Sequence, residues 1–561
     1  MTEITQEPLL TSAKKPHTLL WCLGLFALTV LCVGLTSQDI GYTRDEGYYF
    51  KAGRDYFGWF QAIWRHLFEG NMIKPFEKAT IDKYWSYNHE HPVVVKTLFA
   101  LSYGILKEGL GIFTTDGAAM RFVGWCFGGL TVVMTYLLSL KVMPHRFAIL
   151  ASLLWLCMPR SFWHMHLACF DIPVVFAHLW IVYTYLNSEK SWKNTVWMGV
   201  VFGLAAAIKH NVLLVPPLLV LHWLILQSRW SKNNDTNFQP PAIPLSFFSM
   251  MFIGPLVFIM HWPYLWPDVV SRIQWYLNFH LNHEHYPILY FGQLFSSPPF
   301  PYSFPFVMSA ITIPMVTLVI IVLGVLFGTF LSIKNIKQTR QAAFKNPKNF
   351  LNQPLSIIFL LLLNGLMPFL LIASPNTPIF GGTKHWLNGV PFLIVLAVWA
   401  ISQLFVTSKK SISTAKQWAF ILIMILPSLS LTWHAHPYGL SSYNEVVGFA
   451  RGAANIGFQR TFWGYEPMES WELINERTKK NGKIHLGDTN RASYRTYVKD
   501  NIIRKDLRFT NRVSDADMAS VQPQGEFKKQ WVDVWNQWHI RKPSGVVHID
   551  GVPLSTVTFK P

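Results

Sequence analysis

The sequence contains few charged residues and few cysteines for its length. Only 14% of its 561 residues are charged, whereas 51% are hydrophobic and 24 are Trp. So low a charge content is a poor fit for a water-soluble domain with a single core. The five cysteines lie in or beside apolar runs without metal-ligand or disulfide-framework spacing, which favours small core residues. These features indicate a multi-pass membrane protein.

The basic residues give a formal net charge of +18, which raises the question of a nucleic-acid partner. Many of the Lys and Arg residues, however, lie in short loops between apolar runs, where they favour contact with a membrane surface. We therefore expect membrane lipids as a partner and no nucleic acid.

The apolar runs predict a mainly α, polytopic fold with about eleven transmembrane helices and a small α/β domain at the C-terminus. We expect a cytoplasmic tail over 1–18, a transmembrane domain over 19–433 and an extramembrane domain over 434–561. No small-residue cleavage site follows the first run, so it is expected to be retained as a helix. The predicted spans are 19–37, 119–140, 147–160, 171–187, 195–208, 211–228, 243–262, 305–332, 355–373, 387–406 and 417–433.

Residues 93–110 are also apolar, but Lys96 and Lys107 leave a clean stretch too short to cross a bilayer. An interfacial or re-entrant helix is predicted instead. With this assignment the cytoplasmic segments hold 16 Lys and Arg against 4 Asp and Glu, as the positive-inside rule requires. If residues 93–110 crossed the membrane, every later loop would change sides and would break the positive-inside rule.

This topology brings the long loop 38–118, the start of the span at 171, the loop 263–304 and the region after 434 to one outer face. In the last region, "MESWELINERTKKNGKIHLGD" predicts a helix followed by a strand, and "GVVHIDGVPLSTVTF" predicts a hairpin.

Two adjacent acids, Asp45 and Glu46, occur in "TRDEGYYF" on this face. Thr43 and Glu46 have the spacing of a capping box, so Glu46 is explained by helix capping alone. Asp45 points about 100° away on the same helix and remains available for chemistry. A purely structural first turn and a catalytic Asp45 are both consistent with this motif.

A second acid, Asp171, begins a predicted span on the same face, in "CFDIP". An ionisable residue at membrane depth is a functional hypothesis, although a carboxylate at a helix start with Pro173 beside it is also a common structural device. Several cations are expected nearby, either as snorkelling anchors or as an anion site. They are Lys96, Arg121, Arg160, Lys209 and, as a further polar neighbour, His210.

Two histidine-rich motifs, "NHEHP" and "NFHLNHEHYP", raise the question of a divalent metal. The candidate ligands are His89, His91, His283 and His285. Their spacing matches no firm template, and His-rich outer loops also occur for interfacial reasons. No cofactor is required by the sequence.

Four stretches in order, "DEGYYF", "HEHPVVVKTLFAL", "AAMRFVGWCFGGLTVVMTYLL" and "CFDIP", resemble the protein O-mannosyltransferase and aminoarabinose-transferase family of GT-C membrane glycosyltransferases. The resemblance extends over about residues 20–440. It implies Asp45 as catalytic base, His91 and Pro92 as the family's His-Pro, and Lys96, Arg121 and Asp171 as its Lys, Arg and second acid. The family's second Pro is Val93 here. "GGTKHWLNGVPFL", with His385, is similar to a region of bacterial relatives.

The resemblance implies an inverting transfer of a sugar from a polyprenyl-phosphate donor to a hydroxyl acceptor, which is a lipid, a glycan or a protein. Asp45 and Asp171 would be catalytic, and Lys96, Arg121 and Lys209 would bind the donor phosphate. Glu46, His91, Arg160, His210 and His385 would support them. We expect a bacterial inner membrane with the site on the periplasmic side. The alternatives are a transporter or flippase for an anionic lipid, and an oligosaccharide transferase or ligase.

Overall fold

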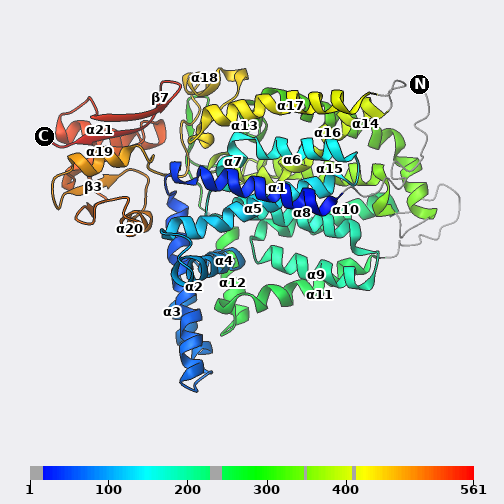
Figure 1. Cartoon of the computed structure of the whole chain (residues 1–561), viewed down its shortest axis with the longest axis horizontal. Coiled ribbons are helices and arrows are strands. Elements are labelled where there is room, and N and C mark those ends of the chain that lie inside the picture. Colours follow the sequence, from blue (N-terminus) through cyan, green and yellow to red (C-terminus); the bar gives the residue numbers. More distant parts are fainter. Residues whose placement is uncertain (1–16, 228–242, 283, 346–349, 407–411) are drawn as a thin grey trace.

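The computed structural model describes residues 17–227, 243–282, 284–345, 350–406 and 412–561. It shows a bundle of helices lying side by side, with a strand-containing region at one end (Figure 1). The expected mainly α fold with a small C-terminal α/β region is confirmed. Most of the predicted cytoplasmic tail lies outside the described residues.

The first half of the chain forms ten α-helices within the described ranges. They are α1 (Thr18–Leu35), α2 (Arg44–Phe68), α3 (Lys78–Trp85), α4 (Val94–Ser102), α5 (Asp116–Ser139), α6 (His145–Leu156), α7 (Pro159–Met165), α8 (Asp171–Ser188), α9 (Trp192–Ala206) and α10 (Val215–Gln227). Helices α2 and α3 run across the end of the bundle rather than along it (Figure 1).

The bundle continues to residue 435. Its later helices are α11 (Leu245–Met260), α12 (Val269–Leu281), α13 (Phe304–Thr312), α14 (Met315–Lys345), α15 (Pro354–Ile372), α16 (Val390–Val406) and α17 (Thr414–Ala435), with a short hairpin of β1 (Ile288–Tyr290) and β2 (Gln293–Phe295).

Seven helical segments of the described ranges are long and apolar enough to cross a membrane. They are Thr18–Asp39, Asp116–Ser139, His210–Gln227, Met315–Ala343, Pro354–Ile372, Leu387–Val406 and Thr414–Ala435. The chain is therefore an integral membrane protein. The other four predicted spans coincide with the shorter helices α6, α8, α9 and α11, of 12, 18, 15 and 16 residues. The total of eleven crossings stays a prediction.

The predicted span 305–332 is not one helix. Its first part is α13, which ends where Ile313 adopts an extended conformation, and α14 begins at Met315. Pro314 explains the break, because proline disfavours the helical conformation of the residue before it and has no N–H to donate.

Residues 94–109 form α4 followed by a π-helical turn, Tyr103–Gly109. This segment is not among the candidate spans of the described chain. A helix here was expected, and its shortness agrees with the interfacial or re-entrant assignment.

The C-terminal region contains a five-stranded mixed sheet in the order β4-β3-β5-β7-β6. Strand β3 pairs parallel with β4 and β5, whereas β7 pairs antiparallel with β5 and β6. The predicted helix-strand unit and late hairpin are both present. The elements are α18 (Phe449–Asn455), α19 (Ser470–Arg477), β3 (Lys483–Leu486), α20 (Arg491–Lys499), β4 (Arg508–Phe509), β5 (Met518–Val521), α21 (Lys528–Trp538), β6 (Gly545–Ile549) and β7 (Val552–Phe559).

Helix α20 and the residue after it attach this region to the bundle. Asp500 accepts hydrogen bonds from the amides of Asp116 (2.7 Å) and Gly117 (3.0 Å) at the start of α5, and from the Tyr42 hydroxyl at 2.6 Å. Gly47 permits a close approach of α20 to α2, since an added Cβ would lie 2.3 Å from Ser493 Oγ. The C-terminal region is thus joined to the start of α5 and to the start of α2, which carries Asp45.

Candidate functional site

A cavity of about 480 Å³ lies between the end of the bundle and the C-terminal region. Its volume falls within the range of ordinary small-molecule sites. The structure brings both candidate acids and several of their predicted neighbours to its wall. The predicted residues that line it are Asp45, His91, Asp171, Lys209, His210 and His385.

The first turn of α2 divides its two acids between different tasks. Thr43 Oγ1 accepts from the Glu46 amide, and the Glu46 side chain accepts from the Thr43 amide at 2.9 Å, so the expected capping box is present. Glu46 is fully buried. Asp45 instead lines the cavity, with 28% of its side chain exposed.

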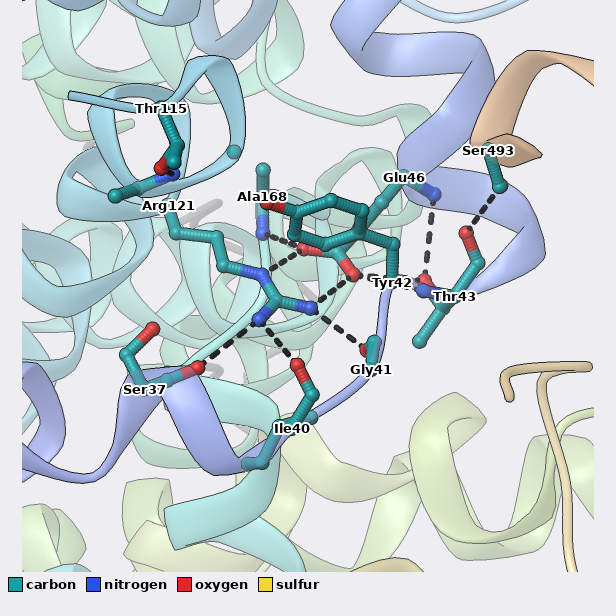
Figure 2. A network of polar contacts seen from close by, with 12 residues as sticks. Ser37, Ile40, Gly41, Tyr42, Thr43, Glu46, Thr115, Arg121, Ala168 and Ser493 are labelled. Atoms are coloured by element: carbon teal, nitrogen blue, oxygen red, sulfur yellow. Dashed lines mark hydrogen bonds and ion pairs between the residues drawn. The ribbon is translucent and has the colours of Figure 1, made fainter. Parts of the chain in front are cut away.

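Glu46 forms a buried ion pair with Arg121 from α5, shown in Figure 2. The Arg121 Nε and NH2 groups donate to the two carboxylate oxygens, each at 2.7 Å. Its remaining hydrogen bonds go to the carbonyls of Ser37, Ile40 and Gly41. The guanidinium therefore fixes the chain that precedes Asp45, and Arg121 is not among the residues that line the cavity.

Asp171 occupies the first position of α8 and is 4% exposed. Its Oδ1 lies 4.0 Å from Lys209 Nζ, and its Oδ2 lies 3.7 Å from His164 Nδ1 without a hydrogen-bond partner. Burial holds the pKa of His164 at about 4, so this imidazole is neutral at neutral pH. Among the described residues Lys209 is the only Lys or Arg within ion-pair distance of Asp171.

Lys384 is a further cation of the cavity, and the sequence analysis missed it. It lies in the 3₁₀ turn η7 (Gly382–His385), with its Nζ 3.9 Å from Asp45 Oδ2. The rings of Phe380 and Trp463 lie on either side, each centroid 4.3 Å from the Nζ atom. Burial lowers the pKa of Lys384, and the charges of Asp45 and Asp171 oppose that shift.

The backbone around Lys384 offers a signal that sequence reasoning could have used. Gly381 and Gly382 have φ values of 67° and 72°, which glycine adopts without strain, so "GGTKH" predicts a tight turn presenting a polar side chain. Trp463 is a non-glycine residue at φ 71°, and its indole donates to the Gly381 carbonyl at 3.1 Å. Such strained residues concentrate at functional sites.

Lys96 is fully buried in α4 and does not line the cavity. Its ammonium donates to the carbonyls of Asn88 and, at 2.9 Å, His91, so it holds the turn that carries His91. Burial lowers the pKa of Lys96 to about 7. Burial, followed by the Lys96 charge, lowers the pKa of His91 well below its usual value, which makes His91 a neutral member of the wall.

Arg160 in α7 is also buried outside the cavity lining. It donates to the Ser442 carbonyl at 3.3 Å, and its guanidinium lies 5.4 Å from the ring centroid of Phe462, which does line the cavity. Arg160 therefore supports the wall from behind.

No group of three or more His, Cys, Asp or Glu side chains suited to a metal ion occurs in the part of the chain that the structure describes. His89 instead lies between the rings of Tyr264 and Trp275, at 4.5 and 4.3 Å. His285 contacts Phe300, and His283 lies outside the described residues. A divalent metal thus gains no support from the geometry of His89, His91 and His285.

Residues 91–253 match the family model described as dolichyl-phosphate-mannose-protein mannosyltransferase. A search of curated proteins finds no match.

Several solved structures are similar in shape. Cupriavidus metallidurans ArnT bound to undecaprenyl phosphate has 13% identity and a TM-score of 0.45, covering 95% of this chain and 97% of that one. Archaeoglobus fulgidus AglB with an inhibitory peptide and a dolichol-phosphate has 12% identity and a TM-score of 0.44, covering 92% and 71%. The S. cerevisiae Pmt1-Pmt2 complex bound to the sugar donor has 18% identity and a TM-score of 0.29, covering 46% and 34%.

The family match includes five of the residues on which the resemblance was based, namely His91, Pro92, Lys96, Arg121 and Asp171. Over residues 91–253 the chain is similar to the dolichyl-phosphate-mannose-protein mannosyltransferases, and the resemblance noted in its sequence is confirmed there.

Proposed function

We propose that the protein is a membrane glycosyltransferase that moves a sugar from a polyprenyl-phosphate donor to a hydroxyl acceptor, with inversion at the anomeric carbon. The observation that carries this proposal is the convergence of two carboxylates and two lysines in one cavity, as the pairs Asp45 with Lys384 and Asp171 with Lys209. The family match over residues 91–253 supports a glycosyltransferase.

Asp45 is the proposed general base. It lines the cavity at the start of α2, where the capping box and the Glu46–Arg121 pair fix the backbone on either side of it. Asp45 accepts the proton of the acceptor hydroxyl while the hydroxyl oxygen bonds to the anomeric carbon. The bond from that carbon to the phosphate oxygen breaks on the opposite face, and the polyprenyl phosphate departs with the bonding electron pair.

Lys209 and Lys384 are the proposed cations for the departing phosphate, because charge develops on its oxygens as the bond breaks. Asp171 holds Lys209 at the wall. Lys384 lies close to Asp45, and the charges of Asp45 and Asp171 oppose the lowering of the Lys384 pKa by burial. For Lys96 and Arg121 the proposal changes from phosphate binding to positioning, since both donate to carbonyls that shape the wall.

A bacterial inner membrane with the cavity on its periplasmic side is part of the proposal. It rests on the excess of Lys and Arg in the loops assigned to the cytoplasm, 16 against 4 acidic residues.

The test uses full-length protein in lipid nanodiscs and a panel of radiolabelled polyprenyl-phosphate hexoses, with release of the bare polyprenyl phosphate as readout. Asp45→Asn should lower the release rate by ~10² to 10⁴, the usual contribution of a general base. Asp55→Asn is the matched control, because Asp55 lies on the same helix, pairs with Lys51 and is not among the cavity-lining residues. Undiminished release by Asp45→Asn overturns the base assignment. Movement of the intact lipid sugar across the bilayer without any release overturns the enzyme in favour of a flippase.

A further inference from the structure

The C-terminal region supplies one wall of the cavity, and this wall has a chemistry of its own. Its polar lining residues are Gln459, Thr461, Asp488, Gln522, Gln524 and Glu526. Among these described side chains none is cationic, whereas the helical bundle contributes Lys209 and Lys384 to the cavity lining. The wall is also bounded by the aromatic residues Phe462, Trp463 and Phe527.

Gln522 follows strand β5 directly and is 6% exposed. Its amide nitrogen donates to the Tyr465 carbonyl at 3.4 Å, which fixes the direction of the side chain. Its Oε1 atom is buried and has no hydrogen-bond partner. Because buried acceptors are normally satisfied, an unpartnered oxygen on a residue that lines the cavity points to a ligand that brings a donor.

Glu526 lies in the 3₁₀ turn Gly525–Phe527 on the same wall. Its carboxylate accepts from the side-chain amides of Gln459 and, at 3.3 Å, Gln524. Among the described residues no Lys, Arg or His lies within ion-pair distance of it. Burial raises the pKa of Glu526 to about 7, with a further contribution from the charge of Asp488.

Asp488 connects this wall to the proposed catalytic turn. It accepts from Arg44 NH1 at 2.9 Å, and Arg44 Nε lies 3.9 Å from Asp45 Oδ1. The Arg44 amide also donates to the Trp463 carbonyl at 3.0 Å. Arg44 therefore links the wall of the C-terminal region to the turn of α2 that carries Asp45.

We propose that Gln522 and Glu526 form a subsite for the hydroxyl groups of a sugar ring, which makes the C-terminal region the specificity wall of the cavity. A sugar ring carries neutral donors for both acceptors and an apolar face for the adjoining aromatic rings. This inference rests on the proposed function. The ring belongs to the donor or to a glycan acceptor, and the two sources share this chemistry.

The experiment measures thermal unfolding of the full-length protein in nanodiscs with three probes. They are polyprenyl phosphate without sugar, polyprenyl-phosphate hexoses (mannose, glucose and N-acetylglucosamine), and the corresponding methyl glycosides added to protein already loaded with the bare lipid. The variants are Gln522→Met, which removes the acceptor at similar length, Gln522→Glu, which restores an acceptor, and Glu526→Gln. Glu472→Gln, an exposed residue of α19, is the matched control.

A wild-type protein with the subsite gains stability from the sugar beyond that from the bare lipid, and its apparent sugar affinity falls ~10-fold to 100-fold in Gln522→Met and Glu526→Gln. Gln522→Glu should recover part of the loss, and the shift caused by the bare lipid should be unchanged in every variant, which shows that they are folded. A gain seen with the lipid-linked hexose assigns the ring to the donor, and a gain seen only with a methyl glycoside assigns it to the acceptor.

Sugar-dependent gains that persist in both variants, or no gain with any sugar probe in the wild type, overturn the subsite. These results are distinct from failure of the proposed function. If the wild type binds the sugar through Gln522 and Glu526 but releases no polyprenyl phosphate, the proposed transfer reaction is overturned and the proposed subsite is supported. If polyprenyl phosphate is released and the variants retain the wild-type affinity for the sugar, the subsite is overturned and the transfer reaction is supported.

Discussion

The Arg121 guanidinium and the Glu46 carboxylate meet through two hydrogen bonds of 2.7 Å, with both side chains almost completely removed from solvent. The Ala168 amide donates to the same carboxylate at 2.9 Å, so the pair joins α2, α5 and the segment that leads into α8. One ion pair thus connects the starts of the two helices that carry Asp45 and Asp171.

We expect removal of one partner of this pair to destabilise the protein strongly. Arg121→Met leaves the Glu46 carboxylate buried without its cation, which costs about 3–5 kcal/mol. Thermal unfolding in detergent should show a large fall for Arg121→Met and for Glu46→Gln. Glu69→Gln, on the exposed end of α2, should have little effect. If the double variant is no more stable than the sum of the single changes predicts, the two residues are not energetically coupled.

The two cavity lysines should affect phosphate binding in the same way. Lys209→Met and Lys384→Met each remove a cation from the proposed leaving-group site, so each should lower the rate of polyprenyl-phosphate release by ~10² to 10³. Both should also weaken binding of the bare polyprenyl phosphate, measured by fluorescence quenching or thermal shift. Lys78→Met, at an exposed site on α3, serves as control. Full retention of phosphate affinity in the double variant would remove both lysines from the phosphate site.

His164 should make the protein sensitive to acid. Its pKa is about 4 when folded, because of burial, against an ordinary value of 6.5. The unfolded state therefore binds more protons between pH 6.5 and 4, and the free energy of unfolding falls as the pH falls through that window, by up to ~3 kcal/mol. His164→Asn should flatten this part of a stability-against-pH curve. His261→Asn, at an exposed site, should leave the curve unchanged. An identical slope for His164→Asn and wild type contradicts the assignment.

Asp500 should control attachment of the C-terminal region. Asp500→Ala removes the acceptor for the Asp116 and Gly117 amides and for the Tyr42 hydroxyl, at a cost of ~1–3 kcal/mol. The segment between α17 and α19 should then be cleaved faster in limited proteolysis, and the rate of polyprenyl-phosphate release should be lower than in the wild type. Asp515→Asn is the exposed control. Unchanged cleavage kinetics would show that Asp500 is dispensable for docking.

The helices were predictable because apolar runs of membrane length leave little choice of structure. Each predicted span overlaps a helix, but 147–160 runs past the end of α6 into α7, and 305–332 is divided between α13 and α14 because Pro314 interrupts the apolar run. The capping box of Thr43 and Glu46 was also predictable, since its signal is local.

The partners of the cations were not predictable from the sequence. The resemblance matches Lys96 and Arg121 to the family's Lys and Arg, yet several of their donors meet backbone carbonyls, and such contacts leave no mark on residue spacing. Lys384 was not predicted as a site residue, although the adjacent His385 was, because only the fold brings residue 384 close to residue 45. The acceptor-rich wall depends on the turns around 522 and 526, whose position relative to α2 is set by Asp488 and Asp500.

The attachment of α20 to the first turn of α2 has a consequence for biosynthesis. Thr43 and Arg44 emerge from the ribosome long before Ser493 and Asn490, which bind their carbonyl oxygens. Before that late segment is made, the cavity around Asp45 lacks the wall that the C-terminal region supplies. The cavity is complete only after the C-terminal region has folded onto the bundle. We therefore expect a stalled or prematurely terminated chain to be inactive rather than unselectively reactive.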